Sequence, residues 1–350
     1  MALITSFYNL AENDRFIHSI KTALACLIGF IAAKYIHFQA MQWIVITTLV
    51  IMCGQINVGS VLQKSYMRFL GTVTGSLLAI LTLKIFGNNL IINMYVVLIA
   101  AIIFSFIATS TKSYNESGTL GAVTVTIILF GTNPSIQTGI ERFLEISLGI
   151  FIAAIISQFI FPIHASTHLR RNQAMTIKKI RTLYLNLFSN PPSPNDTNPL
   201  RNLDEEIIKS LIAQRKLASE ARRERFGKSF NLDYFQQSLW CEKEIIRSII
   251  FMFYAYQKIA DLPSMRENQA LLDTFHQTIS HTLQNISDSI EQNNVSNVIL
   301  NHAGTQLKNN LINLPILSHD ERISVDAFIF CMELLLVRLE RLIGLLTAGT

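Results

Sequence analysis

The first half of the chain is built from long apolar stretches separated by short polar turns. A helix needs about 20 mostly apolar residues to cross the roughly 30 Å of hydrocarbon in a bilayer. Six stretches approach or reach this length, and the second and fifth are the short ones. They are Ile17–Ile36, Met41–Ile56, Met67–Phe86, Leu90–Thr109, Gly118–Phe130 and Ile140–Phe161. The pattern predicts six membrane-spanning helices.

The pattern changes after Pro162, where apolar residues recur every three to four positions between charged ones. This spacing is typical of amphipathic helices that bury one face, and no stretch has the alternation of a strand. The segments are Ser166–Phe188, Asp204–Phe226, Leu232–Ala260, Arg266–Glu291, Val295–Leu314 and Ile323–Leu346. We therefore expect an all-α protein, with a transmembrane domain over residues 1–165 and a cytoplasmic helical bundle over residues 166–350.

The distribution of charge supports the same division. The chain is 50% hydrophobic and only 15% charged, whereas a soluble domain carries about 25% charged residues. Residues 1–165 hold 13 charged side chains, and the 185 residues that follow hold 40. This composition excludes an ordinary soluble enzyme and a disordered chain.

The orientation follows from the positive-inside rule. With both termini in the cytoplasm, the inside segments hold ten Lys and Arg, and the outside ends hold only Lys34, Lys84 and Arg142. We therefore expect a multi-pass membrane protein whose C-terminal domain lies in the cytoplasm. Four widely spaced cysteines suit that reducing compartment. Glu12 and Asp14 beside Arg15 argue against a cleavable signal peptide.

Several residues are not needed in helices that only anchor a protein in the membrane. Gly71 and Gly75 are four residues apart, which is typical of close helix packing. Arg68 precedes them by one turn, and Arg142 and Glu145 are three residues apart, so these two can pair. Ionisable groups at membrane depth usually face a protein interior or a wet path. The alternative is that Arg68, Lys21 and Arg142 are anchors at the ends of spans.

The search for catalytic chemistry finds no complete motif. Gly54–Ser60 resembles the start of a phosphate-binding loop but lacks its lysine. His164 and His168 have i, i+4 spacing, but no third metal ligand lies nearby in the sequence. Basic residues are not interleaved with aromatic ones as in nucleic-acid binders. We expect no enzymatic activity, no catalytic residue, no cofactor, no metal and no nucleic-acid partner.

Four sequence features together resemble the fusaric acid resistance-like family, which groups with the aromatic acid exporters. They are Trp43 with Thr47, Arg68-x-x-Gly71-Thr72-x-x-Gly75, Tyr114 after a short basic turn, and Arg142 with Gly149. The resemblance covers essentially the whole chain. It implies a bacterial inner-membrane protein that exports aromatic carboxylic acids or similar small organic anions by proton-coupled efflux.

Many members of that family contain two copies of the unit seen here once, so the resemblance also implies a homodimer. It leaves open whether a periplasmic accessory protein takes part. Two alternatives remain, a passive organic-anion channel and a non-transporting membrane scaffold or regulator. The expected partners are the anion, membrane lipid and a second copy of the chain.

Side-chain chemistry and position give the candidate site. The residues expected along the substrate path are Arg68, Thr72, Trp43, Thr47, Tyr114 and Arg142. A proton-driven exporter also needs a titratable group, for which Glu145 and Glu116 are the candidates. Gly71 and Gly75 are expected to serve helix packing.

Overall fold

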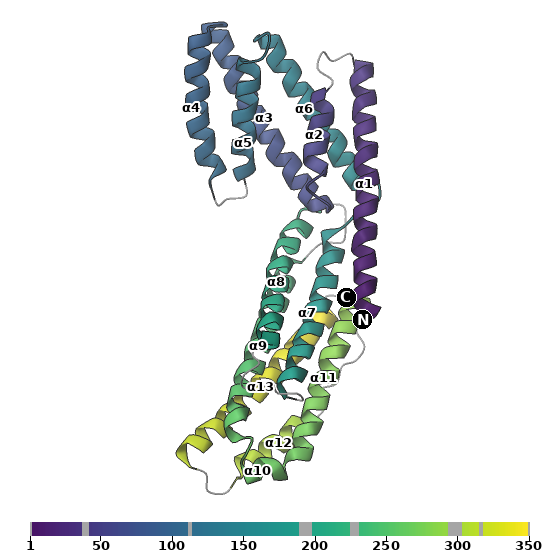
Figure 1. Ribbon diagram of the computed structural model, residues 1–350, viewed down its shortest axis with the longest axis vertical. Coiled ribbons are helices and arrows are strands. Elements are labelled where there is room, and N and C mark those ends of the chain that lie inside the picture. The colour runs from purple at the N-terminus through teal and green to yellow at the C-terminus, as the bar shows by residue number, and fades with distance from the viewer. Residues whose placement is uncertain are drawn as a thin grey trace. The chain divides into compact units, whose positions relative to one another are not determined.

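The computed structural model describes residues 2–36, 42–110, 114–188, 198–224, 231–292, 303–314 and 318–348 (Figure 1). Helices dominate these ranges and none of them contains a strand, so the expected all-α class is confirmed. Contacts divide the chain into two compact units. One holds Met1–Ala165 together with Arg223–Phe226, and the other holds Ser166–Arg222 and Gly227–Thr350.

The first unit has a helix at each of the six expected positions, with shifted ends. α1 begins at Ala2 rather than near Ile17, and α3 begins at Val58 rather than Met67. Met41, expected to start the second span, lies outside the described residues. The helices are α1 (Ala2–Ile36), α2 (Gln42–Met52), α3 (Val58–Phe86), α4 (Leu90–Ala108), α5 (Asn115–Leu129) and α6 (Ile136–Phe159).

Among the described residues, three helical stretches are long and apolar enough to cross a membrane: Asn13–Ile36, Val58–Phe86 and Leu90–Ala108. α2 has 11 residues and α5 has 15, so they extend about 16 and 22 Å, short of the roughly 30 Å of hydrocarbon. α6 carries three charged residues in its first half. The structure thus supports three spans by length and composition, not the expected six.

Helix α3 organises the packing of this unit. It contacts α5 on one side and α6 on another, while α4 packs on α5 and α2 packs on α6. Apolar side chains form two separate clusters, one among α1, α2, α3 and α6 and one among α3, α4 and α5. Because lipid is as apolar as these side chains, close packing and polar contacts must hold such helices together.

The second unit is an amphipathic bundle around one large apolar core. α9 and α13 form its most extensive helix pair. Residues 225–226 and 295–302, parts of two expected segments, lie outside the described residues. The helices are α7 (Ala165–Phe188), α8 (Asn198–Ala221), α9 (Leu232–Ile259), α10 (Pro263–Glu267), α11 (Gln269–Gln292), α12 (Ala303–Ile312) and α13 (His319–Ala348).

A buried polar network joins three helices of this bundle. Gln214 of α8 donates through Nε2 to Glu242 Oε2 of α9 and to Thr176 Oγ1 of α7, both at 2.9 Å. The hydroxyl groups of Thr176 and Ser210 lie 2.6 Å apart. Burial raises the pKa of Glu242 to about 8, although hydrogen bonds from Gln214 and Gln173 oppose the shift. The carboxyl is therefore protonated in the folded protein at neutral pH.

Glu242→Gln is expected to remove a pH dependence of stability. The folded protein keeps this proton up to about pH 8, whereas the ordinary pKa of glutamate is 4.5. The free energy of unfolding therefore falls as the pH rises from about 4.5 to about 8. The measurement is thermal unfolding followed by Trp240 fluorescence in a Trp43→Phe background. The wild-type midpoint should fall by several degrees between about pH 6 and pH 8.

The matched control for this prediction is Glu244→Gln on the same helix, where the carboxylate pairs with Arg247 at 2.7 Å. This variant should keep the wild-type fall in midpoint. An equal fall in Glu242→Gln would show that the buried carboxyl is not its source.

Candidate functional site

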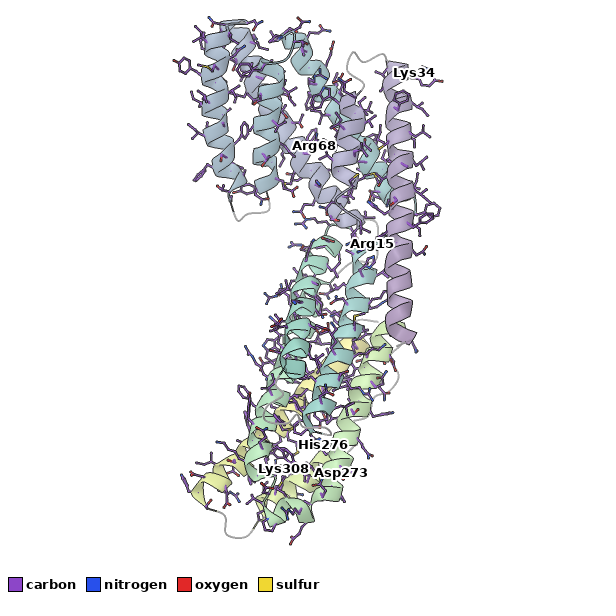
Figure 2. All side chains as sticks on the ribbon, viewed as in Figure 1. Arg15, Lys34, Arg68, Asp273, His276 and Lys308 are labelled. Carbon is purple, nitrogen blue, oxygen red and sulfur yellow. The ribbon has the colours of Figure 1, made fainter. Side chains whose placement is uncertain are left out.

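Arg68 of α3 is a buried cation inside the first unit, with a side chain that faces neighbouring helices (Figure 2). Its Nη2 donates to Thr47 Oγ1 of α2 at 3.3 Å. Its Nε is buried and has no hydrogen-bond partner among the described residues. Those residues also supply no acidic group in an ion pair with Arg68. Among the described residues, the guanidinium therefore contacts a neutral hydroxyl and forms no ion pair.

A second arginine of the unit is neutralised. Arg142 Nη1 donates to Glu145 Oε2 at 2.8 Å, one turn along α6. The Arg142 guanidinium also lies 5.2 Å from the ring centre of Trp43 on α2. Glu145 is only 1% exposed. The spacing of three residues predicted this pair, and the structure contains it.

Helix α2 connects the two arginine environments. Trp43 and Thr47 are one turn apart on α2, so the same helix contacts Arg142 through one residue and Arg68 through the other. A Cβ added at Gly149 of α6 would lie 2.7 Å from the carbonyl oxygen of Ile44. Only glycine permits that approach, which brings α2 against the face of α6 that carries Glu145.

The profile of the fusaric acid resistance protein family matches residues 15–249, more than half of the chain. The chain belongs to this family. The resemblance that the sequence suggested is thereby confirmed, and the match includes every residue of the two arginine environments. Membership in the fusaric acid resistance protein family, together with the long apolar helices, supports a membrane location and a transport role.

Two relatives give the extent of the similarity. Inner membrane protein YeeA of Escherichia coli strain K12 is 25% identical over 296 residues, which are 79% of this chain and 82% of YeeA. Multidrug resistance protein MdtO of the same strain is 27% identical over 228 residues, which are 59% of this chain and 32% of MdtO. The matched part of this family member thus corresponds to most of YeeA but to less than half of MdtO.

The remaining path and coupling candidates lie along α3 and at the start of α5. Thr72 is buried one turn after Arg68. Tyr114 precedes the first residue of α5 and is 40% exposed, and Glu116 is exposed in the first turn of that helix. The contacts that link Arg68 with Thr47, and Arg142 with Trp43 and Glu145, join α2, α3 and α6, whereas Tyr114 and Glu116 lie at the start of α5.

Two basic residues of α1 have roles that the sequence did not reveal. Lys21 is 1% exposed and donates through Nζ to the Ser157 carbonyl at 3.3 Å, near the end of α6. His18 Nε2 donates to the Met52 carbonyl at 2.9 Å, at the end of α2. Both side chains thus satisfy carbonyl groups at helix C-termini, where positive groups are favoured. The only sequence signal was a pair of basic residues three apart in an apolar helix.

Glu224 was also missed, because its partners are distant in sequence. Its carboxylate accepts hydrogen bonds from the backbone amides of Ala165 at 2.7 Å and Gly59 at 3.4 Å. It also lies 3.5 Å from His164 Nδ1, so His164 has an acidic neighbour. Within the described ranges, no group of three or more His, Cys, Asp and Glu side chains is placed to hold a metal ion.

Gly71 and Gly75 bring α3 and α5 into backbone contact. A Cβ at Gly71 would lie 2.6 Å from the Ser117 carbonyl oxygen, and one at Gly75 would lie 2.6 Å from that of Gly121. Real Cβ atoms essentially never approach an atom so closely. The stretch that contains Thr72 therefore keeps its position only while both sites remain glycine.

Gly75→Ala is expected to lower the free energy of unfolding by about 1–3 kcal/mol, because the new methyl group must push two backbones apart. The measurement is thermal unfolding of the purified protein in detergent. Gly29→Ala on α1 is the matched control, since its new Cβ would meet the nearest atom at an ordinary 3.5 Å. Equal midpoints for the two variants would contradict the prediction.

Proposed function

We propose that this protein exports small organic anions, aromatic carboxylates among them, across the bacterial inner membrane, with Arg68 as the cation that contacts the anion. The observation that carries the proposal is the environment of Arg68. It is 8% exposed, its Thr47 contact is neutral, and it has no acidic partner among the described residues. The relatives named for an inner-membrane location and for multidrug resistance support a transport role.

The position of Arg68 makes its charge costly. It is the eleventh residue of α3, about 15 Å along a helix that is long enough to span a membrane. A charged side chain near the bilayer centre costs about 2.5–3.5 kcal/mol on insertion scales. One hydroxyl contact does not neutralise that charge, whereas a bound carboxylate would. Trp43 and Thr72 would line the same route on α2 and α3.

The short helices favour a route lined by protein and water. α2 and α5 extend less far than the hydrocarbon thickness, and backbone at that depth needs protein or water around it. We propose that α1–α6 form the six-span domain, that two copies of the chain associate to complete the route, and that α7–α13 lie in the cytoplasm. A periplasmic accessory protein would extend the route beyond the membrane.

Glu145 is the preferred coupling residue. Its carboxylate is buried and holds Arg142 at 2.8 Å, so protonation would weaken that pair and release the guanidinium. Proton entry would thus change the charge beside the route in step with anion exit. Glu116 is the second candidate, but it lies exposed in the first turn of α5.

A passive anion channel is the second candidate function. It is favoured by the same lack of an acidic partner at Arg68, since a channel needs a cation along its path but no titratable carboxylate. In that case the Arg142–Glu145 pair would serve structure alone. A non-transporting scaffold or regulator is the third alternative, and it would need no anion route.

Arg68→Gln is expected to lower benzoate flux from proteoliposomes at least tenfold, because the cation that compensates the carboxylate is lost. Arg68→Lys, which keeps the charge without the planar fork, should retain part of the flux. Arg15→Gln is the control, since Arg15 is an exposed arginine on α1. Wild-type flux through folded Arg68→Gln protein would overturn the role of Arg68.

The coupling step is tested by imposing a proton gradient on the same proteoliposomes. We expect the gradient to accelerate wild-type flux and to have no effect on Glu145→Gln, with Glu116→Gln as the comparison. Flux that ignores the gradient in the wild type would establish a channel instead. A folded wild-type protein that carries no organic anion would contradict transport altogether.

A further inference from the structure

A hollow of about 420 Å³ lies on the second unit beside Trp240 of α9 and Arg341 of α13. Its lining residues are all exposed, so the hollow is an open depression of the surface with room for a single ring. Trp240 is 39% exposed, which leaves part of its indole available at this surface. The lining residues are Asp233, Gln236, Gln237, Trp240 and Arg341.

Two arginines stack on this indole. The guanidinium carbons of Arg338 and Arg341 lie 4.3 and 5.1 Å from the ring centre of Trp240. The two arginines are three residues apart on α13, so they project from the same side of the helix. A guanidinium over an aromatic face is attracted to the ring and can still donate hydrogen bonds from its planar edge.

Neither arginine has an ion-pair partner among the described residues, and the Nε of Arg338 is buried without a hydrogen bond. Two other arginines of the unit have partners within the protein. Arg181 donates to Ser280 at 3.0 Å, and Arg247 pairs with Glu244 at 2.7 Å. The residues that line the hollow supply one guanidinium, that of Arg341, and one carboxylate, that of Asp233, and the Arg338 guanidinium lies over the indole of Trp240 beside them.

We infer that the hollow beside Trp240 binds a small planar organic carboxylate. Its carboxylate would accept hydrogen bonds from the edges of Arg338 and Arg341, since a guanidinium fork matches a carboxylate in a bidentate geometry. Its ring would pack beside the exposed indole, and the side chains of Asp233 and the two glutamines would meet polar substituents. The guanidinium groups favour an anion over a neutral molecule, and the exposed indole favours a ligand with a flat ring.

The role of this site rests on the proposed function. If the first unit transports organic anions, a site on the second unit that prefers the same anions senses their concentration. Binding itself does not depend on that role, because every residue of the site belongs to the second unit.

Tryptophan fluorescence tests the binding directly, since the chain has two tryptophans. In the full-length Trp43→Phe protein, Trp240 is the sole indole. Benzoate should change its fluorescence in a saturable way. Cyclohexanecarboxylate, equal in charge but not flat, should bind several-fold more weakly, and neutral benzamide should have no effect. A response to benzamide equal to that of benzoate, or no saturable response from folded protein, would overturn the inference.

Two matched arginine variants complete the binding test. Arg341→Gln should weaken benzoate binding at least tenfold, because one of two guanidinium groups is lost. Arg247→Gln on the neighbouring helix should bind as the parent does, because Arg247 already pairs with Glu244. Equal binding by the parent and Arg341→Gln would show that the fluorescence reports another site.

The regulatory role is separated from transport by measuring both properties in proteins that retain Trp43. Arg341→Gln should shift the benzoate concentration that gives half-maximal flux, whereas Arg68→Gln should lose flux. The Arg68→Gln change, introduced into the Trp43→Phe protein, should leave the Trp240 response intact. A Trp240 response without flux in the wild type would contradict the proposed function alone. Flux without that response would contradict this inference alone.

Discussion

The first unit depends on close contact between helix backbones, because lipid provides no hydrophobic force that would press its helices together. Gly71 and Gly75 place the carbonyl groups of α5 where side chains of α3 would otherwise be, and Gly149 does the same between α6 and α2. These contacts determine which faces of α2, α3 and α6 meet. The polar side chains on those faces are therefore brought together by small residues elsewhere on the same helices.

Within that packing, the cations Lys21, Arg142 and Arg68 have different surroundings. Lys21 is bonded to a carbonyl at the end of α6, and Arg142 is paired with a carboxylate. Helix ends and acidic side chains both supply negative potential, so these two charges are compensated. Arg68 is bonded to a hydroxyl, which supplies a dipole but no charge. Arg68 therefore differs from Lys21 and Arg142, whose charges are compensated by a helix end and by a carboxylate.

The sequence predicted what depends on local spacing. The all-α class and the six helix positions follow from apolar runs, and the Arg142–Glu145 pair follows from a separation of three residues. Three of the six expected spans are supported by length and composition among the described residues, because an apolar run does not reveal that the helix in it, such as α2, ends after 11 residues. Contacts between helices that are far apart in the sequence could not be predicted either. Thr47 beside Arg68, and Gln214 between Thr176 and Glu242, depend on which faces meet in the folded chain.

Both tryptophans lie beside arginine guanidinium groups, but among the described residues only the arginine at Trp43 is also paired with a carboxylate. Over Trp43 lies the Arg142 guanidinium, which also holds the Glu145 carboxylate at 2.8 Å. Over Trp240 lie two guanidinium groups, and the described residues give neither of them a carboxylate in an ion pair. The protein therefore already contains the assembly of indole, guanidinium and carboxylate that the hollow on the second unit would form with a ligand. The hollow differs in that the third component must come from solution, which is the requirement of a binding site.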